Sequence, residues 1–353
     1  MGYRFRLFGF IFRIVAIVAA AALCISYISV FISPALSTIP LFFGLFFIPL
    51  VILNILLLVI ALIARSNAGW ITFIFLLPSL FFIDLFVRWG EDSGGQEGRM
   101  LKICSYNVGT FSLSRKYSQS ETIVKIKEFI ESNSPDIVCI QDYYVKENLN
   151  LLKSYDRYPY MYPLAENIGR GYIGNVILSK FPITKTGRLA FDHSSNQCIY
   201  ADIDHLGDTL RIYNAHLESN SISFTSLIKK FRERDNLPEE ISKVHDKMAL
   251  SSKKRASQVE EIISHSNNSP YESIICGDFN DTPVSYTYRN LVRNKKDSFK
   301  ESGKGFSATY STFWPLLRID YILYPERFGS VSHSTRRVDY SDHYPIISEI
   351  IIP

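Results

Sequence analysis

The 353-residue sequence predicts a layered α/β (α+β) domain of two packed mixed β-sheets with flanking helices, preceded by three transmembrane helices. Apolar residues are concentrated in the first ninety positions, whereas the rest of the chain alternates short β-rich runs with turns and helical patterns. The most apolar runs lack a polar face, which indicates strands buried on both sides. Such strands are expected where two sheets pack face to face beneath helices.

The N-terminal part contains three hydrophobic stretches, Ile14–Ile32, Leu41–Ala64 and Trp70–Val87. Each is close to the length of about 20 residues that crosses a bilayer as a helix. A buried hairpin of a soluble domain is the alternative, while a cleaved signal peptide would be followed by polar sequence. We therefore expect residues 1–88 to form a membrane domain, with Asp84 reaching the membrane interface.

The positions of the arginines predict the orientation of this membrane domain. Arg4, Arg6 and Arg13 precede or enter the first stretch, the next loop "SPALSTIP" has no charge, and Arg65 lies in the loop after it. Lys and Arg are retained on the cytoplasmic side, so the N-terminus is expected inside. Three spans would then place the following domain on the extracytoplasmic side of the cytoplasmic membrane, although Arg88 is an opposing signal.

A glycine-rich polar segment, "WGEDSGGQEGR" at 89–99, is predicted to be a flexible linker to a second domain at 100–353. Helices are expected at 120–134, beginning at Ser120 with Glu121, and at 243–264. The expected strands are 101–108, 136–144, 174–183, 197–204, 209–217, 273–280, 318–325 and 344–352.

The second domain is almost neutral. The first 99 residues hold six Lys or Arg and four Asp or Glu, which leaves 32 basic and 30 acidic residues for positions 100–353. Domains that bind duplex nucleic acid without sequence specificity usually carry a larger positive excess, because neutralised phosphates supply most of that affinity. The charge balance therefore does not favour that class of partner.

Several of the expected strands carry metal-binding or phosphate-binding side chains at one end. Oxygen ligands with imidazoles among them suit a Mg²⁺-like ion and the negative charge of a phosphoryl group. Taken singly, Asn107 could be a turn former, Asp320 a partner of Arg318, and His216 a structural histidine. The complete set is Asn107, Asp142, His216, Asp278, Asn280, Asp320, Asp342 and His343.

In order and spacing, "GDFN" and "SDH", with "N-x-H-L" before them and "GNVILSKFPI" in mid-domain, resemble the endonuclease/exonuclease/phosphatase superfamily. This superfamily of metal-dependent phosphoesterases includes deoxyribonucleases, apurinic endonucleases, sphingomyelinases and inositol polyphosphate 5-phosphatases. The resemblance covers about residues 100–353. It implies a four-layer sandwich of two β-sheets between helices, with the site at one end and Mg²⁺ as the cofactor, Mn²⁺ and Ca²⁺ being the alternatives.

The resemblance also implies a catalytic role for each matching residue. Asp278 would orient or deprotonate the attacking water, and Asn280 would hydrogen-bond the phosphate. His343 would bind the scissile phosphate and stabilise its developing charge, while Asp320 holds the imidazole in place. His216 would contact the phosphate from the other side.

The implied metal residues are Asn107, Asp142 and Asp342, and Tyr172 and Asn175 in "YIGN" are the implied substrate-binding residues. Asp142 departs from the family pattern, which has glutamate at this place. Aspartate is one methylene shorter, so a catalytically weak binding module is the alternative to an active enzyme.

The long segment 218–254 interleaves basic residues with Ile222, Phe224, Leu227, Ile228 and Phe231. It is predicted either to lie at a bilayer surface or to pack on its own domain as a helical lid. The expected partners are accordingly the membrane bilayer and a phosphoester substrate, a lipid head group or, alternatively, DNA. The oligomeric state has no signal in the sequence.

Overall fold

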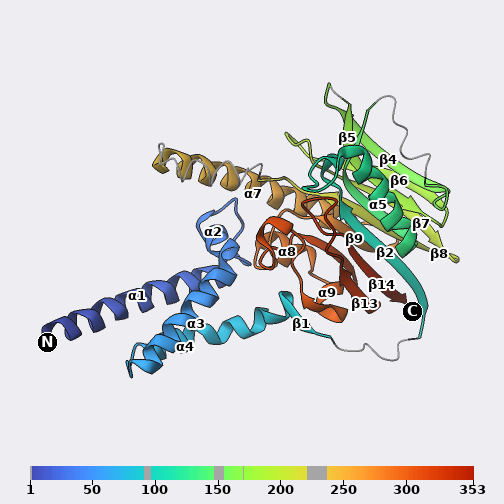
Figure 1. Cartoon of the computed structure of the whole chain (residues 1–353). Helices are drawn as coiled ribbons and strands as arrows, with labels where there is room; N and C mark the ends of the chain where they lie inside the picture. The colour runs from blue at the N-terminus through green and yellow to red at the C-terminus, as the bar shows by residue number, and fades with distance from the viewer. Residues whose placement is uncertain (1, 91–96, 147–154, 170, 221–236) are drawn as a thin grey trace.

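Two six-stranded mixed sheets lie face to face in the computed structural model, which describes residues 2–90, 97–146, 155–169, 171–220 and 237–353 (Figure 1). The first sheet has the order β13 (Gly329–Thr335), β14 (Ile346–Ile352), β2 (Arg99–Asn107), β3 (Ile137–Val145), β5 (Tyr172–Ser179) and β4 (Tyr160–Asn167). The second has the order β10 (Lys295–Asp297), β12 (Asp320–Pro325), β9 (Glu272–Asp278), β8 (Asp208–His216), β7 (Gln197–His205) and β6 (Ile183–Ala190).

The core lies in three layers. Between the sheets, fully buried aliphatic side chains such as Ile103 of β2 and Ile274 of β9 pack together. Helix α5 (Gln119–Asn133) covers the outer face of the first sheet, and helices α7 (Leu237–Asn267) and α8 (Tyr286–Leu291) cover that of the second. The prediction of two packed mixed sheets flanked by helices is confirmed.

Three local predictions differ from the structure. The helix expected at 243–264 is longer at both ends, since α7 spans Leu237–Asn267. Helix α5 begins at Gln119, one residue earlier than expected, because Ser118 forms a reciprocal capping box with Glu121 and leaves Ser120 inside the helix. The run 174–183 is not one strand, since Pro182 lacks the amide hydrogen that a sheet ladder needs. The chain turns there, and β5 and β6 belong to different sheets.

The N-terminal part does not form three transmembrane helices. It contains α1 (Gly2–Ile28), α2 (Ile39–Leu45), α3 (Phe47–Ile63), α4 (Gly69–Leu76) and the 3₁₀ helix η1 (Leu77–Leu85). Among the described residues, one straight helix, Gly9–Ile28, is long and apolar enough to cross a membrane.

Prolines explain why the second and third hydrophobic stretches are not straight transmembrane helices. The second stretch is bent by 70° between α2 and α3, where Pro49 in the first turn of α3 cannot donate back to α2. The third stretch is a shorter apolar segment, Gly69–Leu85, which continues as a 3₁₀ helix from Leu77, with Pro78 in its first turn.

The N-terminal part is attached to the two-sheet domain by specific contacts. Strand β1 (Val87–Trp89) pairs with β11 (Lys304–Phe306), so the first residue of the predicted linker lies in a strand. Positions 91–96 of that linker lie outside the described residues. Asp84 forms an ion pair with Lys300 at 3.1 Å, and its place at a membrane interface stays a prediction. These contacts place the N-terminal helices against the second sheet.

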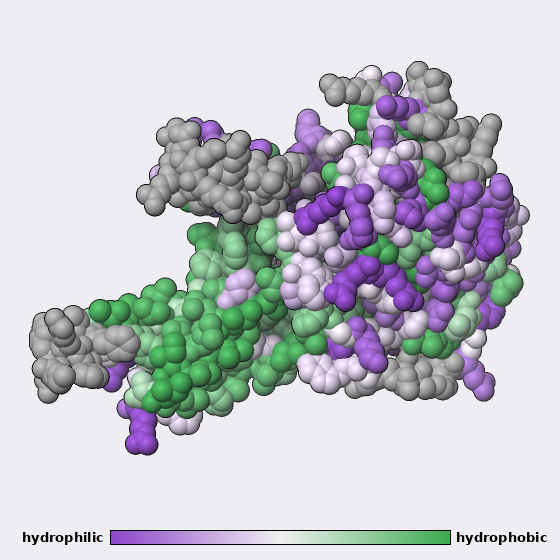
Figure 2. All heavy atoms as spheres, in the orientation of Figure 1, coloured by the Kyte–Doolittle hydropathy of each residue, from purple (hydrophilic) through white to green (hydrophobic). Residues whose placement is uncertain are grey.

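The surfaces of the two parts differ in chemistry. Figure 2 shows hydrophobic side chains over the N-terminal helices and many hydrophilic side chains over the two-sheet domain. Val18 of α1, Leu62 of α3 and Phe81 of η1 are 62%, 67% and 84% exposed. A continuous exposed apolar surface of this kind is expected to contact lipid or another protein.

A buried ion pair fixes the start of β12. The guanidinium of Arg318 pairs with Asp297, and both side chains are almost inaccessible to solvent. The Tyr288 hydroxyl donates to Asp297 at 2.7 Å, and the guanidinium carbon lies 4.9 Å from the Phe299 ring centre. The alternative in which Arg318 is the partner of Asp320 is therefore wrong, and Asp320 remains available to another group.

We expect Asp297→Ala to destabilise the full-length protein by about 3–5 kcal/mol, because it leaves the buried guanidinium of Arg318 without a counter-charge. Denaturant unfolding in detergent, followed by tryptophan fluorescence, measures this loss. Asp339→Ala, which removes an exposed partner of Lys116, is the control and should leave the unfolding midpoint unchanged. Equal midpoints for both variants would contradict the structural role of the pair.

Candidate active site

Strand register brings the central residues of the candidate site together. His216 pairs with Asp278 across β8 and β9, and Asp278 pairs with Asp320 across β9 and β12. From the other sheet, the side-chain amide of Asn107 donates to Asp278 Oδ2 at 2.9 Å. The Asp278 carboxylate therefore lies where the ends of both sheets meet.

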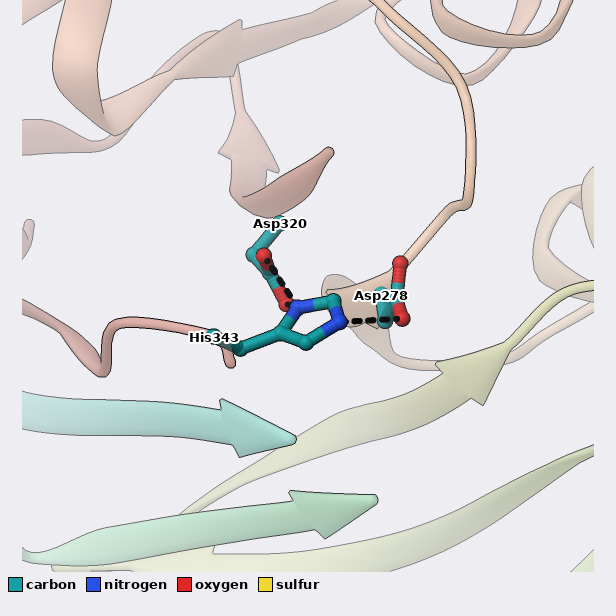
Figure 3. A group of neighbouring side chains, drawn as sticks. All are labelled: Asp278, Asp320 and His343. Carbon is teal, nitrogen blue, oxygen red and sulfur yellow. Dashed lines mark hydrogen bonds and ion pairs between the residues drawn. The ribbon is translucent and has the colours of Figure 1, made fainter. Parts of the chain in front are cut away.

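His343 lies between two buried carboxylates, as Figure 3 shows. Its Nδ1 is 3.0 Å from Asp320 Oδ2, and its Nε2 is 3.7 Å from Asp278 Oδ2. The Ser341 hydroxyl accepts from the His343 amide at 3.2 Å, and the Tyr310 ring lies against the imidazole with ring centres 5.2 Å apart. Asp320 thus orients the ring, and Nε2 faces Asp278.

His216 occupies the opposite side of Asp278. Its Nε2 is 3.7 Å from Asp278 Oδ2, and its Nδ1 is 3.3 Å from Asp142 Oδ1. Asp142 has a φ of 51° and lies where the pairing of β3 with β5 is interrupted, between Ile140 and Tyr143. This β-bulge directs the short Asp142 side chain toward the site although the family glutamate is absent.

Buried carboxylates raise the pKa of both histidines. Burial alone would lower the pKa of His343, but Asp320 and then Asp278 raise it to about 10. Burial likewise opposes protonation of His216, whose pKa is raised to about 9 mainly by Asp142. Burial raises the pKa of Asp278 to about 6, and the two histidines limit that rise. Burial acts in the same direction on Asp142, but His216 holds its pKa below the usual value.

The turn after β9 is shaped by backbone contacts. Gly277 has a φ of 139°, and a Cβ there would collide with the carbonyl oxygen of Ala215, so only glycine fits. The backbone amide of Asn280 donates to Asp278 Oδ1 at 2.8 Å, which leaves Oδ2 facing the histidines. Asp281 accepts from the Thr282 amide at 3.0 Å and serves the turn itself.

A cavity of about 380 Å³ opens over these residues. Asn175 lines it and is itself fixed by donation to the carbonyl oxygens of Gln197 and Asn214, at 3.1 and 3.3 Å. Tyr172, the other predicted substrate residue, begins β5 and does not line the cavity. The predicted residues that line it are Asn107, Asp142, Asn175, His216, Asp278, Asn280, Asp342 and His343.

Sequence reasoning missed Asn214, which connects the two sheets beneath the cavity. Its Oδ1 accepts from Gln141 at 2.7 Å, and its Nδ2 donates to the carbonyl oxygens of Ile140 and Val176, both at 2.9 Å. The asparagine of "N-x-H-L" is this residue, so the motif contained the signal. Both polar atoms of the Asn214 side chain are therefore paired, and these bonds across the core fix the relative position of the sheets.

The donor set fits a divalent cation. Among the described residues, Asp278, Asp320 and His343 have possible ligand atoms within 4.8 Å of one another, although His343 could bind a cation only as the neutral imidazole. Asn107 and Asp142, predicted on the metal side, line the same cavity. The site has more carboxyl groups than imidazoles; the carboxyl groups are those of Asp142, Asp278, Asp320 and Asp342, and the imidazoles are those of His216 and His343. Carboxylate and amide oxygens suit Mg²⁺, Mn²⁺ or Ca²⁺. The individual metal ligands remain predictions.

The fold and the site together place the chain in the class of phosphoester hydrolases built on two packed sheets. The family model for the Endonuclease/Exonuclease/phosphatase family matches residues 104–343, and the chain belongs to this family. Its members hydrolyse phosphoester bonds and typically use a divalent metal. A second model, Domain of unknown function (DUF8431), matches residues 9–86. A search of curated proteins finds no match.

Solved structures of low sequence identity share the fold. An endonuclease/exonuclease/phosphatase from Beutenbergia cavernae DSM 12333 is 15% identical with a TM-score of 0.54, over 72% of each chain. D. rerio TDP2 complexed with single strand DNA product is 17% identical, over 72% of this chain and 99% of its own, with a TM-score of 0.52. The human Nocturnin catalytic domain with bound sulfate anion is 15% identical, over 71% and 94%, with a TM-score of 0.52.

We expect Asp320→Asn to lower the pKa of His343, because it removes the nearest negative charge. The imidazolium is fully present below the ordinary pKa of about 6.5 and is lost as the pH rises through the folded-state value of about 10. Loss of the proton should therefore begin at lower pH in the variant. Titration of labelled histidine by NMR in the metal-free full-length protein measures the midpoint.

Asp339→Asn is the control for this titration and should leave the His343 midpoint unchanged, because Asp339 is an exposed surface residue. An unchanged midpoint in Asp320→Asn would contradict the assignment of Asp320 as the group that holds the imidazole.

Proposed function

We propose that the protein is a divalent-metal-dependent hydrolase that cleaves the phosphoester of a lipid head group at a membrane surface. The observation that supports a lipid is the wall of the catalytic cavity itself. Leu41 and Leu45 of α2, in the apolar N-terminal part, line the same cavity as Asp278 and His343. An apolar wall beside a phosphoester site suits a substrate that is polar at one end and apolar at the other.

The chain's own groups fit in-line attack of water on phosphorus. Asp278 accepts a proton from the attacking water, and the water oxygen forms the new bond to phosphorus as the bond to the leaving oxygen breaks. The imidazolium groups of His343 and His216 face the nonbridging oxygens and neutralise their developing charge. A divalent cation held by the predicted metal residues Asn107, Asp142 and Asp342 would supply Lewis-acid stabilisation of the leaving oxygen. The leaving oxygen takes a proton from solvent.

The attachment of the N-terminal helices supports action at a bilayer. The Ser29 hydroxyl, just beyond α1, donates to the carbonyl oxygen of Val284 at 3.0 Å, three residues after Asp281. A span formed by Gly9–Ile28 would thus end directly at the two-sheet domain. With the basic N-terminus retained inside, this domain would lie on the extracytoplasmic side of the cytoplasmic membrane.

We expect Asp278→Asn to lower kcat for head-group release from liposomes by about 10²–10⁴-fold, the range for a positioned base. The measurement uses full-length protein with Mg²⁺, and phosphatidylcholine and phosphoinositide liposomes are assayed beside supercoiled plasmid. Asp339→Asn, outside the cavity, is the matched control and should retain wild-type kcat. Chelation of divalent ions should abolish turnover, and added Mg²⁺ should restore it.

Each alternative outcome would indicate a different function for the protein. Plasmid nicking that depends on Asp278, without release of head groups, would make the protein a membrane-tethered nuclease. Absence of turnover in the wild type on every substrate would favour the catalytically weak binding module that Asp142 suggests. Equal rates for Asp278→Asn and wild type would overturn the proposed mechanism.

A further inference from the structure

A second cavity, of about 130 Å³, adjoins the catalytic cavity. Its walls come from the connection between α2 and α3 and from the loop before β12. Thr282 is its sole lining residue with a polar side chain among the described residues. The complete lining is Gly44, Leu45, Phe46, Phe47, Ile48, Pro49, Phe86, Thr282, Phe313, Leu316 and Leu317.

The two cavities share part of their walls. Leu45, Thr282 and Leu317 line both of them. A molecule with its phosphoester beside Asp278 would therefore meet apolar side chains directly next to the reacting group. At the outer end, Phe46 and Leu316 are 55% and 37% exposed, so the apolar lining reaches the surface.

The position of α2 is fixed by close packing. Gly44 is buried, and a Cβ there would lie 2.5 Å from the carbonyl oxygen of Val284, so glycine permits the approach of α2 to the two-sheet domain. Leu41 and Leu45 are four residues apart and share the face of α2 that turns toward the catalytic cavity. The apolar wall is therefore part of the folded protein, built by its N-terminal segment.

Thr282 lies at the junction of the cavities. The residue is 4% exposed, and its Oγ1 has no hydrogen-bond partner among the residues that the structure describes. A buried hydroxyl without a partner costs free energy unless a ligand or water satisfies it. A polar atom at the head end of an apolar chain, such as an ester carbonyl oxygen, would accept from this hydroxyl.

We propose that the second cavity is an acyl-chain subsite, which binds the first methylene groups of a phospholipid-like substrate next to the phosphoester. This inference rests on the proposed function for the catalytic cavity and assigns its substrate class: an amphiphilic phosphoester with an alkyl or acyl chain. Phe46 and Leu316 contact the chain, and the Thr282 hydroxyl donates to the polar atom that joins the chain to the head group.

The test uses full-length protein in amphipol, because detergent chains would compete for the subsite. Methyl, butyl and octyl p-nitrophenyl phosphodiesters share one reacting group and differ only in chain length. We expect kcat/KM to rise about fourfold for each of the first methylene groups, as burial of a methylene predicts, and then to level off. The double variant Phe46→Asn/Leu316→Asn should reduce the butyl-to-methyl ratio of kcat/KM severalfold.

Leu36→Asn is the matched control, since Leu36 is an apolar residue of the same N-terminal part, is 84% exposed and lines neither cavity. It should retain the wild-type ratio. A ratio near one in the wild type, or an equal fall in both variants, overturns the subsite while turnover that needs Asp278 still supports the phosphoesterase.

Binding separates the two proposals if no diester is hydrolysed. Calorimetry with methyl, butyl and octyl phosphonates then measures affinity without turnover. Affinity that rises with chain length in the wild type and not in Phe46→Asn/Leu316→Asn supports the subsite although the proposed activity has failed. Affinity independent of chain length overturns it.

The role of Thr282 has its own readout. Thr282→Val keeps the shape of the side chain and removes the hydroxyl, so it should lower affinity about fivefold for a lysophospholipid with an ester linkage. The corresponding ether lipid, which lacks the carbonyl oxygen, should bind the variant and the wild type equally. Equal losses for ester and ether lipids would contradict the assigned hydrogen bond.

Discussion

One buried oxygen, Oδ2 of Asp278, is the contact on which the arrangement of the site depends. It accepts from Asn107 of the opposite sheet at 2.9 Å and lies 3.7 Å from both His216 Nε2 and His343 Nε2. A buried carboxylate is tolerable only where donors and opposite charges surround it. The two sheets must therefore meet with the correct register, and the polar network around Asn214 beneath them maintains it.

The same residues explain how much of the protein could be predicted from sequence. The eight expected strand regions of the second domain all contain strand, because buried β-rich runs bounded by turns are local signals. Motif order also identified the residues that gather at the cavity. Strand register was beyond sequence reasoning, since the pairing of Asp278 with both His216 and Asp320 depends on contacts distant in sequence. The roles of individual side chains stay predictions.

The wrongly predicted transmembrane helices have a physical cause, because hydropathy does not register the constraints that proline and tertiary contacts place on a helix. Pro49 and Pro78 interrupt two stretches whose hydropathy alone indicated straight spans. Sequence alone also did not show that Asp84 pairs with Lys300, or that Tyr172 at the start of β5 does not line the cavity. The bend at Pro49 has a consequence for the site, because it leaves the short helix α2 beside Thr282.

This position of α2 addresses a difficulty that any hydrolase of lipid head groups meets. Drawing a lipid from the bilayer toward a polar site exposes its chain to water, at about 0.8 kcal/mol for each methylene group. Apolar side chains that extend from the exposed Phe46 to Leu45 at the catalytic cavity would keep the chain covered along that path. An N-terminal segment that only anchored the domain would not need to line its cavity. The shared wall therefore favours a segment that both holds the enzyme at the bilayer and forms part of its substrate site.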